Sequence, residues 1–359
     1  MDSAVTALRL VEQGRALEAA MVRLWPGEDE RSCCSPGALQ RARQTAAAVG
    51  VPFHVLDEAS DFAARVVEPF VASYVAGETP NPCVRCNPRR LAALVRLADE
   101  LGGGRVATGH YARLVWRGGE PYLARAVDAL KDQTYMLWAV PPDILARLEF
   151  PLGESTKSEV RAAAAAAGLP SATQPESQEV CFALDGYRGF LEARGVAPAR
   201  GAVVDVEGRA LGEHEGHWRY TIGQRRGLGI ASEQPLYVLE RRADHNEVVV
   251  GPRQELQVRE VAVREMVDRG LGDGHDLLVQ LRYRSAAVPV AGIERRPAAT
   301  AVIHLAEEFS GAAPGQSAVF YRDDVLVGGA VIAEPPPRQE GSVIGFGLSG
   351  RLTQSIRSD

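Results

Sequence analysis

The first half of the chain alternates between two spacings of apolar positions. Residues 4–13 and 36–50 carry them at helical intervals, and Gly50 is suited to end the second helix. Residues 18–25 and 51–57 are short apolar runs typical of strands. Further helices are predicted at residues 62–74 and 89–101, and a strand running into a turn at 105–114. This alternation predicts an α/β domain built on a parallel sheet.

The pattern changes near residue 198, where short β-type runs separated by Gly, Asp and Asn turns begin. These runs are residues 201–216, 217–230, 235–251, 258–267, 276–285, 300–308 and 316–332. They predict two small β-barrels. We therefore expect an α/β domain over residues 1–197, a central barrel over 198–256 and a C-terminal barrel over 257–333. Residues 334–359 have Pro, Gly and Ser without strong periodicity, which predicts a disordered tail.

Composition narrows the class of protein. The 359 residues are 46% hydrophobic, enough for two or three domains. The balance of 40 Lys+Arg against 46 Asp+Glu excludes a uniformly basic nucleic-acid coat, although local basic patches remain open. No apolar run approaches the roughly 18 residues of a spanning helix, and the start resembles no signal peptide. Five cysteines, an odd number, do not indicate a disulfide framework, so we expect a cytoplasmic protein with no membrane partner.

The stretch TPNPCVRCNPRR, residues 79–90, places Cys83 and Cys86 between three prolines. Proline fixes φ and removes a backbone donor. We therefore expect a rigid, exposed turn here, neither a helix nor a central strand, that presents both thiols.

Three chemistries are open to Cys83 and Cys86. The first is half of a structural zinc site, which needs four ligands. The second is redox or nucleophilic sulfur chemistry, in which Arg85, Arg89 and Arg90 would lower the pKa of the thiols. The third is an iron–sulfur cluster with one open iron. Spacing alone does not rank the last two.

The other cysteines differ in their context. Cys181, in the polar-flanked stretch 174–186, is the distant partner that the second and third chemistries would use. Cys33 and Cys34 are adjacent, so their side chains diverge and form a poor chelating pair. We expect them in a surface loop before the helix at residue 36, where Cys34 or Ser35 could serve as a cap.

Eight segments, taken in order, resemble the tRNA-specific 2-thiouridylase family. They are TPNPCVRCN (79–87), ATGHYAR (107–113), KDQTYML (131–137), STKSEVR (155–161), ESQEVCF (176–182), YTIGQRRGLG (220–229), LRYR (281–284) and PGQSAVFY (314–321). The resemblance runs from the first residues to about 332. It implies an ATP-pyrophosphatase α/β domain of the adenine nucleotide alpha hydrolase type, followed by two β-barrels.

The resemblance also implies a reaction and its partners. The wobble uridine of certain tRNAs, those for Lys, Glu and Gln, would be adenylated at its C2 oxygen with ATP and Mg²⁺. A persulfide sulfur would then replace that oxygen, giving 2-thiouridine, AMP and pyrophosphate. The sulfur would come from a cysteine desulfurase, often through a relay protein, and we expect a monomer. The target base would have to be flipped out of the anticodon loop.

Individual roles follow from matching positions. The resemblance implies that Cys86 is the nucleophile and Cys181 the cysteine that carries the persulfide. It implies that the residues contacting ATP are Asp2, Ser3, Val22 and Gly109. It implies tRNA contacts by Asn81, Pro82, Cys83, His110, Lys131, Asp132, Gln133, Tyr283, Arg284 and Gln316. Two thiols suit this chemistry, because one carries the outer sulfur and the other attacks to release it, leaving a disulfide.

Plainer interpretations stand beside these roles. His110 could be a strand-end histidine satisfied by backbone, and residues 131–133 an ordinary turn and helix cap. The pair Arg225 and Arg226 could be a solvated hairpin edge. Residues 283 and 284 are predicted on an alternating strand, where one side chain faces the core by default.

The chain departs from the family pattern at its start. The family has a strand followed by a Ser-Gly-Gly-Val-Asp-Ser loop that binds ATP phosphates. Here Asp2 and Ser3 match the last two positions, and the strand and the glycines have no counterpart. We expect either that the reading frame begins upstream of Met1 or that ATP binding is impaired. The central sheet is then expected to have an exposed gap.

A second departure is Cys83, because many family members carry aspartate there as a proposed general acid or base. A thiol has a different pKa and weak hydrogen-bonding capacity. The resulting C-x-x-C favours the cluster hypothesis, a [4Fe-4S] cluster on Cys83, Cys86 and Cys181. Two alternatives to a sulfurtransferase remain: another ATP-pyrophosphatase, such as an argininosuccinate synthetase, and a tRNA-binding homologue that has lost catalysis.

Overall fold

A computed structural model describes residues 1–25, 27, 29, 31–32, 34–169 and 180–334. In its first part, β1 (Ala19–Arg23) pairs in parallel with β2 (Phe53–Asp57), and α2 (Pro36–Val49) connects them. The Ser35 hydroxyl caps α2 by accepting from the Ala38 amide at 3.0 Å, and Gly50 ends the helix at φ 78°. These predicted elements are confirmed.

The parallel sheet is divided into two pieces. Besides β1 and β2, the strands β3 (Val106–Ala107) and β6 (Leu148–Glu149) form a second parallel pair. Within the described residues the two pairs form separate sheets. Helices α1 (Asp2–Glu12) and α7 (Lys157–Ala166) pack together near the second pair, and Val5 and Val160 are fully buried between them.

A long helical segment follows β2. It comprises α3 (Ala59–Phe62), a π-helical turn (Ala63–Val67) and α4 (Glu68–Val75). One side buries Phe62, Phe70 and Tyr74 in an apolar cluster. Other short helices of this half are the 3-10 turn Thr134–Met136, α6 (Pro142–Leu145) and α8 (Tyr187–Ala193).

The predicted loop over residues 79–90 is wrong, because helix α5 (Pro82–Glu100) begins within it. Asn81 is the cap, and its Oδ1 accepts from the Cys83 amide at 3.1 Å. Pro82 occupies the first helical position, where its missing amide hydrogen costs nothing and its φ suits a helix. Pro88 lies inside the helix, which continues past it. Both thiols therefore stand on the first turns of a helix.

The hairpin β4 (Arg113–Arg117) and β5 (Glu120–Ala124) leaves the α/β half and joins the C-terminal sheet. Val325 of the C-terminal half pairs with Ala124, and the amide of Arg125 donates to the Asp324 carbonyl at 2.8 Å. The predicted domain sequence does not include this exchange, because spacing identifies a strand but not the sheet it joins.

The central part is a four-stranded sheet in the order β8-β7-β10-β9. Its strands are β7 (Gly201–Val204), β8 (Ala210–His214), β9 (Tyr237–Arg242) and β10 (Glu247–Gly251). The predicted β-run over residues 217–230 is wrong: it is a 3-10 turn, His217–Arg219, followed by loops. Trp218, Tyr220 and Ile222 alternate with polar residues as in a strand, but Gly223, Gly227 and Gly229 have φ of 83°, 77° and 70°, which interrupts an extended backbone.

The C-terminal part is a barrel of six strands in the order β11-β14-β13-β12-β15-β16, closed by pairing of β11 with β16. The strands are β11 (Gln257–Asp268), β12 (Leu278–Gln280), β13 (Val288–Arg296), β14 (Thr300–Ser310), β15 (Ser317–Arg322) and β16 (Val325–Ile332). Residues 283 and 284 were predicted on a strand, which is wrong: β12 ends at Gln280, and Arg284 is in a turn at φ 62°.

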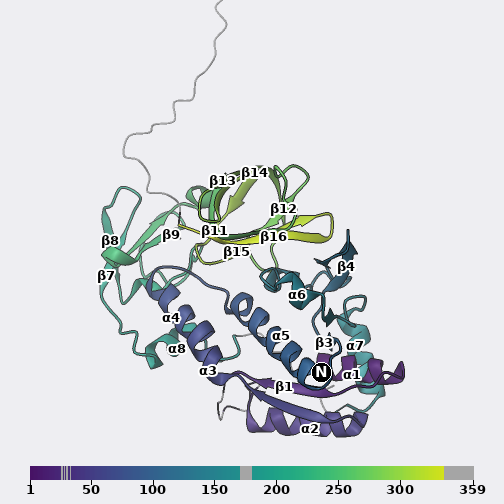
Figure 1. The fold of residues 1–359 in the computed structure, drawn as a ribbon. Coiled ribbons are helices and arrows are strands. Elements are labelled where there is room, and N and C mark those ends of the chain that lie inside the picture. Colours follow the sequence, from purple (N-terminus) through teal and green to yellow (C-terminus); the bar gives the residue numbers. More distant parts are fainter. Residues whose placement is uncertain (26, 28, 30, 33, 170–179, 335–359) are drawn as a thin grey trace, which may run out of the picture.

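Figure 1 shows the barrel on one side of the molecule and β1, β2 and α2 on the other, with α5 between them. Trp138 and Tyr135 of the α/β half pack against Val319 and Tyr321 of the barrel in one continuous core. Helix α5 therefore lies between the C-terminal barrel and the first parallel strand pair (Figure 1). Of the predicted tail, residues 335–359 lie outside the described residues. None of the described helices is both long and apolar enough to cross a membrane.

Candidate functional site

The first two turns of α5 present three chemically useful side chains on one side: Cys83, Cys86 and Arg90. Both thiols are half-buried. Burial raises the pKa of the Cys83 thiol, and the Arg90 guanidinium acts in the opposite direction. Arg85 and Arg89, also expected to act on the thiols, instead form ion pairs with Glu265 at 3.6 Å and Asp61 at 3.7 Å.

Cys86 and Cys181 contact the same apolar cluster, although 95 positions separate them in sequence. The cluster is centred on the rings of Phe62, Phe70 and Phe182, which pack edge to face. Cys181 lies in a turn immediately before Phe182, so the aromatic anchor holds the thiol at the cluster margin. The structure thus brings both predicted sulfur-handling residues to one region.

Cys34 belongs to the same cluster and is 6% exposed. The Leu24 amide donates to its sulfur at 3.4 Å. The prediction of a surface loop is therefore wrong for Cys34, whose small apolar side chain is buried like a core residue. Ser35, the other residue named as a cap, does cap α2. Cys33 lies outside the described residues.

Within the described ranges, no group of three or more Cys, His, Asp or Glu side chains is arranged to hold a metal ion. Cys83, Cys86 and Cys181 therefore do not form a ligand set for zinc or for an iron–sulfur cluster in this structure.

The start of α1 forms a second group of predicted residues. A Cβ atom on Gly109 would lie 2.7 Å from the Ser3 nitrogen, so the backbone near Gly109 closely approaches Asp2 and Ser3. Lys157 Nζ donates to both Asp2 carboxylate oxygens, at 2.7 and 2.8 Å. No side chain among the described residues caps the first amides of α1, which suits them to phosphate binding. Val22, the fourth predicted ATP contact, is on β1 at the margin of the aromatic cluster.

His110 connects the two groups. Arg90 Nη2 lies 2.9 Å from Nε2 of His110, and Thr108 Oγ1 lies 2.8 Å from Nδ1. Burial, together with the Arg90 charge, lowers the pKa of His110 to about 3. Arg90 also donates to Asn87 Oδ1 at 2.9 Å, and the Asn87 amide donates to the Met136 carbonyl at 2.8 Å. The imidazole is thus held neutral by side chains as well as by burial.

The predicted tRNA triplet at residues 131–133 divides into different roles. Asp132 is buried, and its oxygens accept from the Ala126 amide at 2.9 Å and the Thr134 hydroxyl at 2.6 Å. Burial raises the pKa of Asp132. Gln133 Oε1 accepts from the Tyr111 amide at 2.9 Å. Both side chains therefore hold backbone amides around this turn, but Gln133 does not cap the 3-10 turn Thr134–Met136 that follows it, so the helix cap of the plainer interpretation is not formed by its side chain.

Of the predicted contacts from the barrel, Gln316 is bonded to the segment before α5. Gln316 Nε2 donates to the Thr79 carbonyl at 2.6 Å, two residues before the helix cap. Tyr283 packs against Tyr135 with ring centroids 5.9 Å apart, and the Arg284 guanidinium lies 5.1 Å from the Tyr283 ring centre. Arg225 and Arg226 are both exposed, and Arg225 lines a loop groove.

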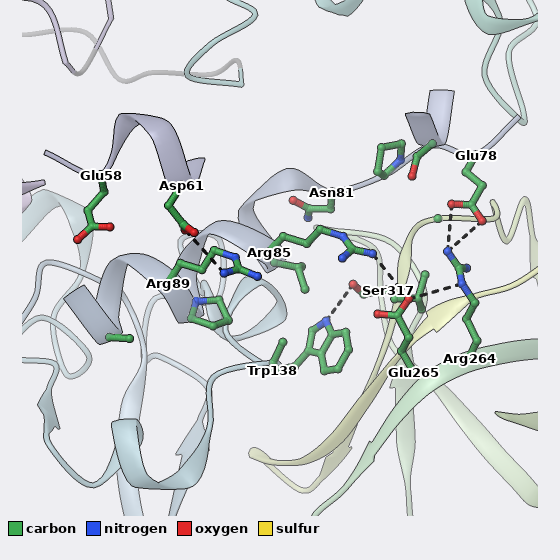
Figure 2. Close-up of a pocket in the computed structure, with 18 of the residues that line it drawn as sticks. Glu58, Asp61, Glu78, Asn81, Arg85, Arg89, Trp138, Arg264, Glu265 and Ser317 are labelled. Atoms are coloured by element: carbon green, nitrogen blue, oxygen red, sulfur yellow. Dashed lines mark hydrogen bonds and ion pairs between the residues drawn. The ribbon is translucent and has the colours of Figure 1, made fainter. Parts of the chain in front are cut away.

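A cavity of about 520 Å³ lies on the opposite side of α5, between the helix and the barrel. Figure 2 shows Arg85 and Arg89 from α5 pointing into it, with Arg264 and Glu265 facing them from β11. Glu78 pairs with Arg264 at 3.0 Å across one end. Sequence reasoning did not find Glu78, Arg264 or Glu265, because each lies in an ordinary strand or loop pattern and becomes part of the cavity through tertiary packing alone.

The chain is thus a three-part protein: an α/β domain carrying thiols at a helix start, a four-stranded β domain and a closed barrel. Family models match each part: the tRNA methyl transferase HUP domain over residues 1–185, the tRNA methyl transferase PRC-barrel domain over 188–252, and the aminomethyltransferase β-barrel domain over 255–332.

Curated relatives give the particular family. The chain is 42% identical to the tRNA-specific 2-thiouridylase MnmA of Roseiflexus sp. strain RS-1, covering 93% of this chain and 96% of that protein. It is 42% identical to the MnmA of Acidithiobacillus ferrooxidans, covering 92% and 95%. It is also 49% identical to the bifunctional protein NifU/MnmA of Rubrobacter xylanophilus, covering 93% of this chain and 68% of that protein. The chain belongs to the tRNA-specific 2-thiouridylase (MnmA) family.

Proposed function

We propose that this protein is an ATP-dependent tRNA-uridine 2-sulfurtransferase that converts the wobble uridine to 2-thiouridine. Membership of the MnmA family supports this reaction, and the uncapped start of α1 beside Gly109 supports ATP use. The observation that carries the proposal is the placement of Cys86 and Cys181 on one apolar cluster. Magnesium would accompany ATP and neutralise phosphate charge.

The chemistry assigns a distinct task to each thiol. ATP transfers its adenylyl group to the uridine C2 oxygen, releasing pyrophosphate and making that oxygen part of a leaving group. Cys181 carries a persulfide delivered by a cysteine desulfurase or a relay protein. The terminal sulfur attacks C2 and AMP leaves, while the Cys86 thiolate attacks the remaining Cys181 sulfur, giving a thiocarbonyl and a Cys86–Cys181 disulfide. An external thiol reductant then restores both thiols.

The start of α5 would meet the extruded base. Asn81, Pro82 and Cys83 form the cap and first turn there, directly before Cys86. His110 lies close to the same helix and is the other proposed contact in this area. Lys131, Tyr283 and Arg284 would hold the tRNA backbone at a greater distance. The proposal also includes three domains, over residues 1–197, 198–256 and 257–333. We propose in addition that the protein is cytoplasmic and monomeric.

The test replaces the cysteines singly in the full chain. Purified Cys86→Ser and Cys181→Ser variants, given ATP, a tRNA transcript and a persulfide donor, should form no 2-thiouridine by nucleoside mass spectrometry. Cys34→Ala is the matched control, since it alters a thiol of the same cluster that the reaction does not use. If the wild-type chain binds tRNA yet never forms 2-thiouridine, the alternative of a homologue without catalysis replaces this proposal.

A further inference from the structure

The short segment before α5 is held by both β domains. The Thr79 amide donates to the Pro314 carbonyl at 2.7 Å, and the Thr79 carbonyl accepts from Gln316 Nε2 at 2.6 Å. Its hydroxyl accepts from Arg241 Nη2 at 2.9 Å. Pro314 and Gln316 precede β15 of the C-terminal barrel, whereas Arg241 is on β9 of the central sheet. Every polar group of Thr79 is therefore bonded to another domain.

The neighbours of Thr79 are held in the same way. Arg241 Nη2 also donates to the Gly77 carbonyl at 2.5 Å. Glu78 pairs with Arg264 of β11 at 3.0 Å, as Figure 2 shows. A Cβ atom on Gly315 would lie 2.9 Å from the Glu78 Cβ, so the barrel backbone contacts this segment without an intervening side chain.

The burial of the Arg241 side chain in this contact is energetically unfavourable. It is 4% exposed, and its Nε and Nη1 atoms have no hydrogen-bond partner among the described residues. Burial lowers the pKa of Arg241. A buried guanidinium with unpaired donors costs free energy that a well-packed apolar side chain would not. We therefore expect that Arg241 serves to position other residues, and not to increase the stability of the fold.

The position of Thr79 is transmitted to the thiols through a stiff connection. Pro80 and Pro82 fix φ on both sides of Asn81, and the Asn81 side chain is itself bonded to the Cys83 amide. From Pro82 onward the backbone is helical, so Cys86 is one turn further along a rigid element. Displacement of Thr79 would therefore move the first turn of α5 as a unit.

We propose that Arg241 and Gln316 are positioning residues that together hold Thr79 and thereby fix the start of α5, with Cys86, relative to both β domains. The inference rests on the proposed thiolation at Cys86 and deepens it. It assigns to the Gln316 side chain the role of holding the protein backbone, in place of the tRNA contact that the resemblance implies. Reacting groups displaced by about 1 Å can lose about 10²-fold in rate.

The experiment compares Arg241→Met, Gln316→Met and Thr79→Val with the wild-type chain. Thr79→Ser keeps the hydroxyl and should behave as wild type. Arg242→Met is the matched control, because Arg242 is the next residue on β9 and pairs instead with Glu240 and Glu247 at the surface. Steady-state thiolation gives kcat and KM for tRNA, and the alkylation rate of Cys86 in the tRNA-free protein gives a second readout.

The expected result is a kcat about 10²-fold lower in the three variants, with the KM for tRNA changed less than about twofold and the Cys86 alkylation rate altered. Thr79→Val keeps the inference testable if Arg241→Met does not fold. A raised KM at unchanged kcat for Gln316→Met, or a lower melting temperature with normal kcat and normal Cys86 alkylation, would overturn it. If the wild-type chain makes no 2-thiouridine, the proposed function fails, and the alkylation rates still decide this inference.

Discussion

The Arg90 guanidinium donates a hydrogen bond to Nε2 of His110 across 2.9 Å, joining helix α5 to the segment that follows β3. Arginine has no acceptor atom, so Nε2 of His110 must accept. The hydrogen of the neutral ring is then on Nδ1 and is donated to Thr108 Oγ1 at 2.8 Å. The hydrogen bond from Arg90 thus fixes the tautomer, the neutral state and the orientation of the His110 ring.

This contact predicts how acid affects the fold. The pKa of His110 is lowered to about 3 in the folded chain, against about 6.5 when unfolded. Between these values the unfolded chain binds a proton that the folded chain does not, so the free energy of unfolding falls as the pH falls below about 6.5. His110→Asn should lose about 1–2 kcal/mol less stability than wild type between pH 7 and pH 5. Denaturant unfolding at several pH values measures this. The exposed His275→Gln is the control, and parallel curves for wild type and His110→Asn would contradict the prediction.

The Cys83 thiol should be mostly protonated near neutral pH, so that only a small thiolate fraction reacts. Burial raises its pKa, and Arg90 partly opposes this effect. The rate of Cys83 alkylation, followed by peptide mass spectrometry, should therefore rise with pH through a midpoint above that of an ordinary thiol. Arg90→Met should move the midpoint higher, whereas Arg90→Lys retains the positive charge and should move it less. A midpoint below that of a free cysteine would refute the assignment.

Substitutions of Lys131 and of Gln133 should have different effects on the salt dependence of tRNA binding. If Lys131 contacts a phosphate, Lys131→Ala weakens tRNA binding and reduces the slope of log affinity against log salt by about 1. The Gln133 side chain holds the Tyr111 amide, so Gln133→Met should lower the melting temperature and leave the salt slope unchanged. Titrations of tRNA at several salt concentrations distinguish the two. Equal changes of slope in both variants would show that residues 131–133 act as one contact.

Much of the fold follows from the spacing of apolar residues. The helix over residues 36–49 and strands β1 and β2 could be predicted because their patterns are local. The start of α5 could not be predicted, because its prolines have opposite meanings. Pro82 at the first helical position is compatible with a helix, whereas Pro88 inside the helix argues against one. Pairing of β5 with β16 joins Ala124 to Val325, 201 positions further along the chain (325 minus 124), which no local pattern contains.

The candidate site divides in the same way. Cys83, Cys86 and Cys181 were identified from their residue type and motif. The burial of Cys34 and the contact between Gln316 and Thr79 arise only when distant elements pack together. Sequence therefore names the reactive groups, while the residues that position them become visible in the folded chain.

A side chain at Gly329 should destabilise the fold, because the Trp138 ring packs directly on the Gly329 backbone. A Cβ atom there would lie 2.4 to 2.6 Å from three atoms of the Trp138 ring. Trp138 is buried, and its Nε1 donates to the Ser317 hydroxyl at 2.9 Å, so the ring cannot move aside without breaking that bond. Gly329→Ala should therefore lower the free energy of unfolding by about 1–3 kcal/mol through overpacking.

The matched control is Gly292→Ala on β13, where no atom lies within 4 Å of the added Cβ and the backbone already suits an L-residue. That variant should be as stable as wild type or slightly more so, because alanine loses less backbone entropy on folding. Denaturant unfolding of both variants gives the comparison. Since Trp138 joins the α/β half to the barrel, Trp138→Leu should partly restore stability in the Gly329→Ala background by making room for the methyl group. Equal stability of the two alanine variants would show that the ring adjusts freely, and that this junction between the α/β half and the barrel is less tightly packed than the contact distances imply.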